Sequence, residues 1–502
     1  MRTTTSLLFA TLALGACGDN LSPGGDGDGD GPGPAGRTVT GSHLVLYKLL
    51  DKTLLDDPAF DMSDTLIEGH VARGGGWDIY PGVGHRDGSF EIPGLPDGPM
   101  WLRVATRPVG EVFYWTDADH VDFDEPVLGP EDPPRSADDD RLNLALTGLA
   151  PWQDGDSIAW FVPEDIVFAQ SLVGVPPEPG STELTGTSVD WSGRPLADTG
   201  PGEPAFVVQY RPQELALGVE VIAPIRAASP TMHQVAGTTG TLTATLAAPP
   251  VLPYRLNWAR DAFEATRAEI HPTRAEASSS HWFSVVAMPG LVDGEAWISV
   301  DYPVASLVDP SILEGTTPLD LGELAIPNPY PRAWLTDSYV VTFPVSLPMP
   351  DGSPWTIEAA VGTRRTEFPT ATSPAAPAIT PIRAPKIGWR DAFTDLDGVG
   401  LTPVISWQAP ATGTATSYEL TIVEAVLDPL PPYRPGWYIT ATLVVPGDVT
   451  SLQVPADLLV EGKTYAMIVK AIAQPGQDIT TRPFRIGGVY AFAEAVTGRF
   501  TP

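Results

Sequence analysis

The sequence predicts a mainly β protein, with several β-sandwich domains in tandem and one short helix in the middle region. Two observations support this prediction. Glycine (49) and proline (55) together exceed a fifth of the 502 residues, and helix interiors tolerate neither residue well. Short segments of alternating apolar and polar residues are separated by turn pairs such as Asp-Gly, which is the pattern of strands joined by tight turns.

Residues 1–16 have the features of a secretory signal peptide. Arg2 provides a charged start, an apolar run extends from Leu7 to Leu14, and small residues precede Cys17, which is the only cysteine. The apolar run is too short to span a bilayer. The segment Leu14-Gly15-Ala16-Cys17 resembles the lipobox of bacterial lipoproteins. This resemblance implies cleavage before Cys17 and attachment of acyl chains, such as palmitate, to that residue.

The resemblance also predicts where the protein is located. Several acyl chains would hold it on a membrane, at about 0.8 kcal/mol per buried methylene group. A free reactive thiol at Cys17 is one alternative, and a disulfide from Cys17 to a second chain is another. Gly18 is compatible with outer-membrane sorting, so we expect a lipid-anchored cell-envelope protein, in the outer membrane. Residues 17–36 lack aromatic and β-branched residues and are therefore predicted to form a flexible acidic tether.

The charge of the chain limits its partners. The net charge of −33 opposes binding to nucleic acid, which needs clustered Lys and Arg. No second apolar stretch reaches the length of a membrane span. We therefore expect contact with the membrane through the N-terminal lipid, no nucleic-acid partner, and an unidentified protein or polysaccharide as the further partner.

In residues 37–116, Asp-Gly turns precede two strands. The turn at Asp87-Gly88 leads to alternating Phe90 and Ile92, and the turn at Asp97-Gly98 leads to residues 100–104. This order of a DG-x-F strand, a turn and a closing strand resembles the carboxypeptidase-regulatory-like β-sandwich. The resemblance implies an accessory scaffold without catalytic residues of its own.

Residues 117–140 are predicted to form an exposed acidic linker, because ten acids and four prolines occur there with Arg135 as the only strong base. Carboxylates alternate at its start, and hard cations such as calcium bind several carboxylate oxygens. The candidate metal ligands are Asp117, Asp119, Asp122 and Asp124. A solvated acidic edge is the alternative, and no other cofactor is expected.

Two β-rich domains are predicted in the middle of the chain, over residues 141–235 and 236–375. In the second, Asn257 is positioned to cap a helix from Trp258 to Ile270, and Pro272 would end it. The apolar stripe of this helix is moderate, so we expect it to pack across a sheet or between domains.

Residues 380–502 contain the strongest local pattern. Trp407 follows alternating residues in one predicted strand, and Leu459 lies six residues before Tyr465. This spacing resembles the "tyrosine corner" of fibronectin type III modules, whose tyrosine hydroxyl bonds to upstream backbone. The usual proline is replaced by Glu461, and the insertion from Gln474 to Gly488 is longer than usual.

The sequence contains no HExxH pair, G-x-S-x-G elbow or glycine-rich phosphate loop, and the segment from Ser278 to His281 is interpreted as a loop. We therefore expect a non-enzymatic surface protein, acting as an adhesive or scaffolding string of modules. One alternative is a glycan-binding or hydrolase-accessory protein with an aromatic-lined site between the middle domains. Another is a calcium-dependent adhesion module. The tryptophans expected to line loops are Trp77, Trp115, Trp152 and Trp191.

Overall fold

The computed structural model describes most of the chain beyond the tether. The described residues are 36–48, 54–57, 61–74, 76–104, 111–128, 141–162, 167–171, 177–190, 203–214, 220–232, 239–288, 291–292, 295–296, 305–310, 317–366, 373–426, 436–483, 486–487 and 489–502. The predicted signal peptide and almost all of the tether lie outside them. The prediction of a mainly β protein with several packed sheets is confirmed.

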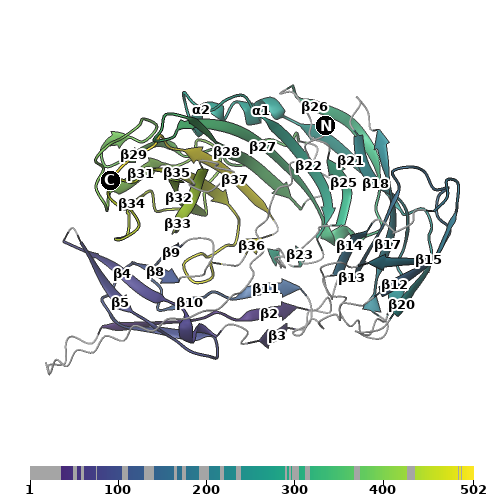
Figure 1. The fold of residues 1–502 in the computed structure, drawn as a ribbon, viewed down its shortest axis with the longest axis horizontal. Coiled ribbons are helices and arrows are strands. Elements are labelled where there is room, and N and C mark those ends of the chain that lie inside the picture. The colour runs from purple at the N-terminus through teal and green to yellow at the C-terminus, as the bar shows by residue number, and fades with distance from the viewer. Residues whose placement is uncertain are drawn as a thin grey trace.

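One sheet of 16 strands passes through every part of the chain (Figure 1). In spatial order its strands are β14 (Val167–Ser171), β13 (Ser157–Val162), β17 (Phe206–Glu214), β18 (Glu220–Ala228), β25 (Ala305–Pro310), β22 (Ser280–Ala287), β27 (Leu335–Pro348), β28 (Pro354–Arg365), β37 (Tyr490–Val496), β35 (Tyr465–Ala473), β32 (Ser417–Val426), β33 (Gly436–Pro446), β9 (Glu111–Thr116), β8 (Met100–Val104), β4 (Ile67–Arg73) and β5 (Gly76–Pro81).

Smaller sheets complete the modules. Two of them lie in the N-terminal part. One consists of β10 (His120–Asp122), β1 (Arg37–Ser42), β7 (Ser89–Leu95) and β6 (Val83–Gly84). The other consists of β11 (Glu125–Leu128), β2 (Val45–Lys48) and β3 (Leu54–Asp57). The others are β15 (Glu183–Asp190) with β12 (Arg141–Thr147) and β20 (Thr239–Thr245), β16 (Glu203–Pro204) with β19 (Thr231–Met232), β21 (Val251–Trp258) with β26 (Leu319–Pro327), β23 (Leu291–Val292) with β24 (Glu295–Ala296) and β36 (Ile486–Gly487), and β30 (Arg390–Asp391) with β29 (Arg383–Ile387), β31 (Val404–Gln408) and β34 (Ser451–Gln453).

Three hydrophobic cores lie between these layers. One fills the N-terminal sandwich around Phe90 and Leu102. A second fills the sandwich formed by β12, β15 and β20 around Trp160. The largest runs from the middle of the chain into the C-terminal module, where Trp407 contacts Tyr418 edge to face with ring centroids 5.1 Å apart. The cores therefore follow the alternation of apolar residues along each strand.

The modules are joined by strand pairing. Strand β9 of the N-terminal module pairs in parallel with β33 of the C-terminal module, from Glu111 opposite Ala441 to Tyr114 opposite Val444. Figure 1 shows the N-terminal module, in purple and blue, beneath the green and yellow C-terminal module, while the middle strands extend from the C-terminal module across the top to the right. The chain thus closes on itself and brings together segments more than 300 residues apart in sequence.

The boundary expected between the two middle domains does not coincide with the strand pairing. Strand β20, which the prediction placed in residues 236–375, pairs in parallel with β12 along its whole length. Strands β18 and β25 then connect the two regions through Val221 and Ile222. This arrangement depends on pairing between segments that are distant in sequence. Local sequence patterns do not predict such pairing.

The helix expected from Trp258 to Ile270 is shorter than predicted and divided. Trp258 ends β21, where it pairs with Leu319, and the helices are α1 (Arg260–Glu264) and α2 (Arg267–Ile270). The N-cap residue of α1 is Ala259, without a side-chain cap, so the expected cap at Asn257 is wrong. Cross-strand pairing with β26 takes these residues out of the helix. Among the described residues, further helical turns are η1 (Met62–Asp64) and η3 (Arg332–Trp334).

The first half of the expected acidic linker is part of the fold. Strand β10 pairs in parallel with β1, and β11 pairs in parallel with β2. Residues 129–140 lie outside the described residues. No helix in the described part of the chain is both long and apolar enough to cross a membrane.

Candidate functional site

The predicted acidic candidates are held by protein donors. Asp122 accepts a hydrogen bond from Ser42 (3.2 Å) and pairs with the ring of His120 (2.7 Å). Asp124 accepts from the Ser42 hydroxyl and the Leu44 amide, at 3.0 and 3.1 Å. Ser42 thus joins β1 to the segment that follows β10.

The other two candidates lie near Arg37, at the start of β1. Its guanidinium bonds to the Asp119 carboxylate (3.0 Å) and to the backbone oxygen of Asp117 (2.6 Å). No group of three or more His, Cys, Asp or Glu side chains among the described residues is arranged to hold a metal ion. Donors from the protein therefore contact the carboxylates of Asp119, Asp122 and Asp124, and the predicted calcium site stays a prediction.

Cys17 and Trp191 lie outside the described residues, so their predicted roles stay predictions. The loop interpretation of Ser278 agrees with its surroundings. Its hydroxyl lies 3.1 Å from His281 Nε2, and the imidazole is buried against Trp258, with ring centroids 5.9 Å apart. The contact anchors the start of β22 to the core.

The predicted loop tryptophans occupy strands or a core. Trp152 is buried in the second core and lines no exposed loop. Trp77 and Trp115 instead belong to β5 and β9, where they pack at the margin of the largest core. The structure brings these two residues onto the same sheet face, which lies in the N-terminal module and not between the middle domains.

This sheet face carries a cluster of aromatic residues, most of which are buried against the largest core. Direct cross-strand partners on it are Ile79 with His70, His70 with Trp101, and Trp101 with Trp115. Trp77 and Phe113 lie two residues along their strands from Ile79 and Trp115, and so point to the same side. We call this set the tryptophan face, composed of His70, Trp77, Ile79, Trp101, Phe113 and Trp115.

The rings on the tryptophan face contact one another edge to face. Trp101 meets Trp115 with centroids 5.0 Å apart and Phe113 at 6.5 Å, while His70 meets Phe113 at 5.4 Å. Each such pair adds about 0.5–1.5 kcal/mol beyond the burial of its area. Trp101 is fully buried by its neighbours, whereas Trp77 and Trp115 remain partly accessible. The rings therefore hold one another in fixed orientations.

A row of charges crosses the same face. Glu68 accepts from His70 (2.9 Å) and Arg103 (2.8 Å), and Arg103 also bonds to Glu111. Burial opposes ionisation of Glu68, but the hydrogen bonds from His70 and Arg103 outweigh burial and hold the pKa of its carboxyl below the ordinary value. Glu68 is thus ionised at neutral pH and paired with Arg103.

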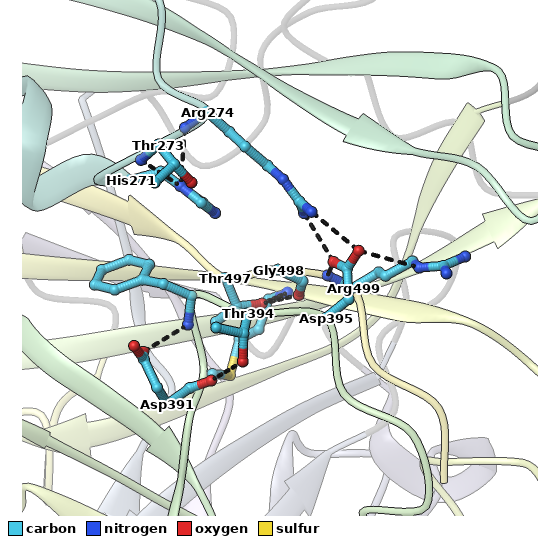
Figure 2. Close-up of polar contacts among 11 residues, drawn as sticks. His271, Thr273, Arg274, Asp391, Thr394, Asp395, Thr497, Gly498 and Arg499 are labelled. Atoms are coloured by element: carbon cyan, nitrogen blue, oxygen red, sulfur yellow. Dashed lines mark hydrogen bonds and ion pairs between the residues drawn. The ribbon is translucent and has the colours of Figure 1, made fainter.

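A second polar cluster joins the middle of the chain to the C-terminal module (Figure 2). Arg274 donates two hydrogen bonds to Asp395, at 2.8 and 2.9 Å, and Asp395 also accepts from the Arg499 amide at 3.1 Å. The hydrogen bonds from Arg274 are the main cause that lowers the pKa of Asp395. The acidic residue therefore clamps the turn after α2 onto the C-terminal strand.

His271 lies beside this clamp in the neutral form. Its Nδ1 accepts from the Thr273 and Arg274 amides, at 3.3 and 3.1 Å, and its ring packs 5.3 Å from Phe393. Burial, followed by the charge of Arg274, lowers the pKa of His271 to about 4. A proton on Nδ1 would face two donors and break the turn.

We expect acid to weaken the fold through His271. The unfolded chain takes up a proton near the ordinary pKa of 6.5, and the folded protein does so only near 4, so this stability is complete above pH 6.5 and is lost as the pH falls toward 4. The full loss is about 3 kcal/mol. Urea unfolding across this range should show it, and His271→Gln should remove that part of the pH dependence. An identical pH dependence in the variant would contradict this assignment.

The tyrosine corner of the C-terminal module has the geometry that the sequence predicts. The Val460 amide donates to the Tyr465 hydroxyl at 3.0 Å, and Tyr465 is fully buried. We expect Tyr465→Phe to lower the free energy of unfolding by about 1 kcal/mol, since the Val460 amide loses its hydrogen-bond acceptor. Thermal unfolding measures the change, and Tyr438→Phe, at a half-exposed position, should change it little. Equal effects of the two variants would argue against a structural role for this hydrogen bond.

Comparison with known proteins identifies no relative of this chain. No family model matches, and no curated protein matches. A streptococcal ancillary pilin is 12% identical, with 64% of this chain and 95% of the pilin covered and a TM-score of 0.12. E. coli alpha-2-macroglobulin in its native conformation is 10% identical, with 89% of this chain and 27% of that chain covered and a TM-score of 0.13. Similarities at this level support no statement about function. The function is therefore inferred from the chain's own residues.

Proposed function

We propose that this protein is a non-enzymatic, lipid-anchored protein of the cell envelope, whose linked β modules act in adhesion or as a scaffold. The observation that supports the proposal best is the continuous 16-stranded sheet, because it joins the modules into one body that presents sheet faces to the surroundings. The lipobox-like segment ending at Cys17 supports attachment to the outer membrane.

The C-terminal module fits this role as a fibronectin type III-like domain. Its strands are arranged as β29, β31 and β34 in one layer and β37, β35, β32 and β33 in the other. That arrangement and the bond between Val460 and Tyr465 support the assignment. Such modules act through their surfaces, which agrees with an adhesive or scaffolding function.

The anchor is tested by Cys17→Ala. We expect this variant to leave the membrane fraction or to remain as an unprocessed precursor, because no other residue can carry the acyl chains. Fractionation and intact-mass measurement check the result, with Ser22→Ala in the tether as the matched control. Unchanged fractionation together with unchanged mass would contradict the anchor.

The same variant tests the adhesive function. Cells that display the wild-type protein should attach to a test surface. Cells that release the Cys17→Ala protein should fail to attach to the same surface. Surface labelling of intact cells confirms that the two strains differ in the displayed protein. Equal attachment by both strains would contradict adhesion through this chain.

A further inference from the structure

Trp389 is the most exposed large apolar side chain among the described residues, at 85%. It lies at the tip of the hairpin between β29 and β30, in the layer of the C-terminal module that also contains β31 and β34. Figure 1 shows this layer at one end of the molecule, beside the C-terminus. Tryptophan is on average a well-buried residue, because its indole is a large apolar group. An indole left this open to water therefore points to a surface that covers it.

The backbone that carries this indole is fixed on both sides. Ile387 pairs with Arg390 across the hairpin, and Gly388, with a φ of 65°, takes the first position of the two-residue turn. The Gly388 amide donates to the Val404 oxygen at 2.7 Å. The Arg390 guanidinium donates to two carbonyl oxygens of the following loop, at 2.8 and 3.3 Å. Binding at this turn therefore does not need to order the chain first.

Two more exposed apolar side chains lie next to the turn. Val404, whose oxygen bonds to Gly388, is 45% exposed, and Leu401, three residues before it, is 49% exposed. Single apolar residues on a surface are ordinary, but here three large ones occur together at the end of one module. We call Trp389, Leu401 and Val404 the apolar tip. Its small area and protruding position suit partial insertion into another phase.

The sequence around the apolar tip is poor in acids. No Asp or Glu occurs over residues 368–390 or 398–418, although the chain contains 62 of them. Strand β29 carries two exposed bases, Arg383 and Lys386. Of the carboxylates between the two acid-free stretches, Asp395 is already paired across the clamp to the middle of the chain. This end of a strongly acidic chain is therefore locally favourable to phosphate groups.

We propose that the apolar tip inserts into the surface of a phospholipid bilayer, with Trp389 between headgroups and acyl chains and with Arg383 and Lys386 at lipid phosphates. Tryptophan favours this boundary because its ring is apolar and its N–H can bond to water or headgroups. Each base near an anionic lipid surface adds attraction. The proposal deepens the envelope function, and rests on it in taking the chain to be held beside a membrane.

The predicted tether gives the apolar tip access to that membrane. Residues 17–36 can extend to at most about 70 Å, while a folded chain of this length has a radius of gyration of about 23 Å. The tether is thus long enough for the end of the body to turn toward the bilayer. A lipid at Cys17 makes the second contact intramolecular, so a weak insertion is sufficient to orient the protein.

A bilayer fits the apolar tip better than a protein partner does. A specific protein interface covers about 800 Å² on each partner, around an apolar centre. Beyond the tip, the residues of β31 that alternate with its buried ones are polar, Ser406 and Gln408. The net charge of −33 opposes approach to anionic lipid, but salt screens it beyond about 8–10 Å. The charges nearest the tip therefore decide, and only Asp391, opposite Lys386, offsets one base of β29.

The test is flotation with vesicles of phosphatidylcholine and phosphatidylglycerol. The protein is the chain from residue 17 onward carrying Cys17→Ala, which keeps every described residue and lacks both acyl chains and the apolar run of the signal peptide. It should float with the vesicles, and adding Trp389→Ala should weaken partitioning about tenfold. Tyr438→Ala, at an aromatic residue 50% exposed on β33, is the matched control and should partition unchanged. Lys386→Gln should weaken partitioning several-fold at low salt and little at high salt.

Brominated acyl chains distinguish insertion from adsorption at the headgroups. Bromine quenches only indoles that reach the acyl chains, so vesicles of brominated phosphatidylcholine and phosphatidylglycerol should lower the emission of the parent protein. Trp389→Ala should remove this quenching. Because Trp389 is so exposed, this variant should melt as the parent does. Where it does not, Leu401→Ser replaces it, with a several-fold loss of partitioning expected.

Other outcomes overturn the proposal. These are absence of flotation, equal flotation of Trp389→Ala and the parent, equal loss in Tyr438→Ala, or quenching that persists without Trp389. Capture of an envelope protein through Trp389 without flotation would assign the apolar tip to a protein partner. The vesicle experiments use a protein without acyl chains, so they do not depend on the fractionation test of Cys17. The lipid anchor and the insertion of the tip therefore fail separately.

Discussion

Replacement of Asp337 by alanine is expected to lower the free energy of unfolding by about 3–5 kcal/mol, because it removes the acceptor at the centre of a buried network. Arg365 donates to Asp337 through Nε at 2.9 Å, and the hydroxyls of Tyr254 and Tyr339 donate at 3.1 and 3.2 Å. Burial raises the pKa of both tyrosines, so they stay protonated donors. Without the carboxylate, the Arg365 guanidinium and the two tyrosine hydroxyls lose their shared acceptor in the largest core.

Asp320→Ala provides the control for this prediction. Asp320 pairs with Arg255 at 2.9 Å, between side chains that are 45% and 47% exposed, and such surface pairs contribute about 0–1 kcal/mol. Denaturant unfolding of both variants measures the two losses. Similar losses would show that the Asp337 network contributes no more than an exposed ion pair.

Trp258→Ala is expected to cost about 3–5 kcal/mol, since it opens a large cavity in a close-packed core. Trp258 is fully buried, and its ring lies 5.4 Å from Tyr339 and 6.2 Å from both Phe263 and Phe283. These contacts join β21, α1 and the large sheet. Loss of the indole therefore removes packing between three elements at once.

Trp389→Ala is the matched control for the cavity. This tryptophan is 85% exposed, so its removal should change stability by no more than about 0.5 kcal/mol. Thermal and denaturant unfolding of the two variants give the comparison. A small loss in Trp258→Ala would indicate that the surrounding core collapses around the missing ring.

Local patterns predicted the parts of the fold that depend on neighbouring residues. The spacing of Leu459 and Tyr465 predicted the hydrogen bond at the tyrosine corner, because one short turn positions both partners. The helix from Trp258 failed because cross-strand pairing with Leu319 holds that residue in β21. The acidic run from Asp117 was assigned to a linker, since nothing local reveals that β1 accepts β10 as a parallel neighbour.

The candidate site was predictable only in part. The alternation of Trp101 with Leu102 separates two sheet faces, and this much is visible in the sequence. The sequence could not indicate that Trp77 and Trp115 share one of them, since that depends on the register of β5, β4, β8 and β9. Nor could the sequence indicate that Ser42 and Arg37, from a distant strand, donate hydrogen bonds to Asp122 and Asp119.

The pairing of β9 with β33 also affects how the chain folds during synthesis. The N-terminal module emerges first, but one edge of its sheet has no neighbour until residues 441–444 arrive. Contacts between such distant residues form slowly, because a very long loop must close. An open strand edge also invites pairing with other chains. A chaperone that covers β9 until the C-terminal strands are made would therefore raise the yield of correctly folded protein.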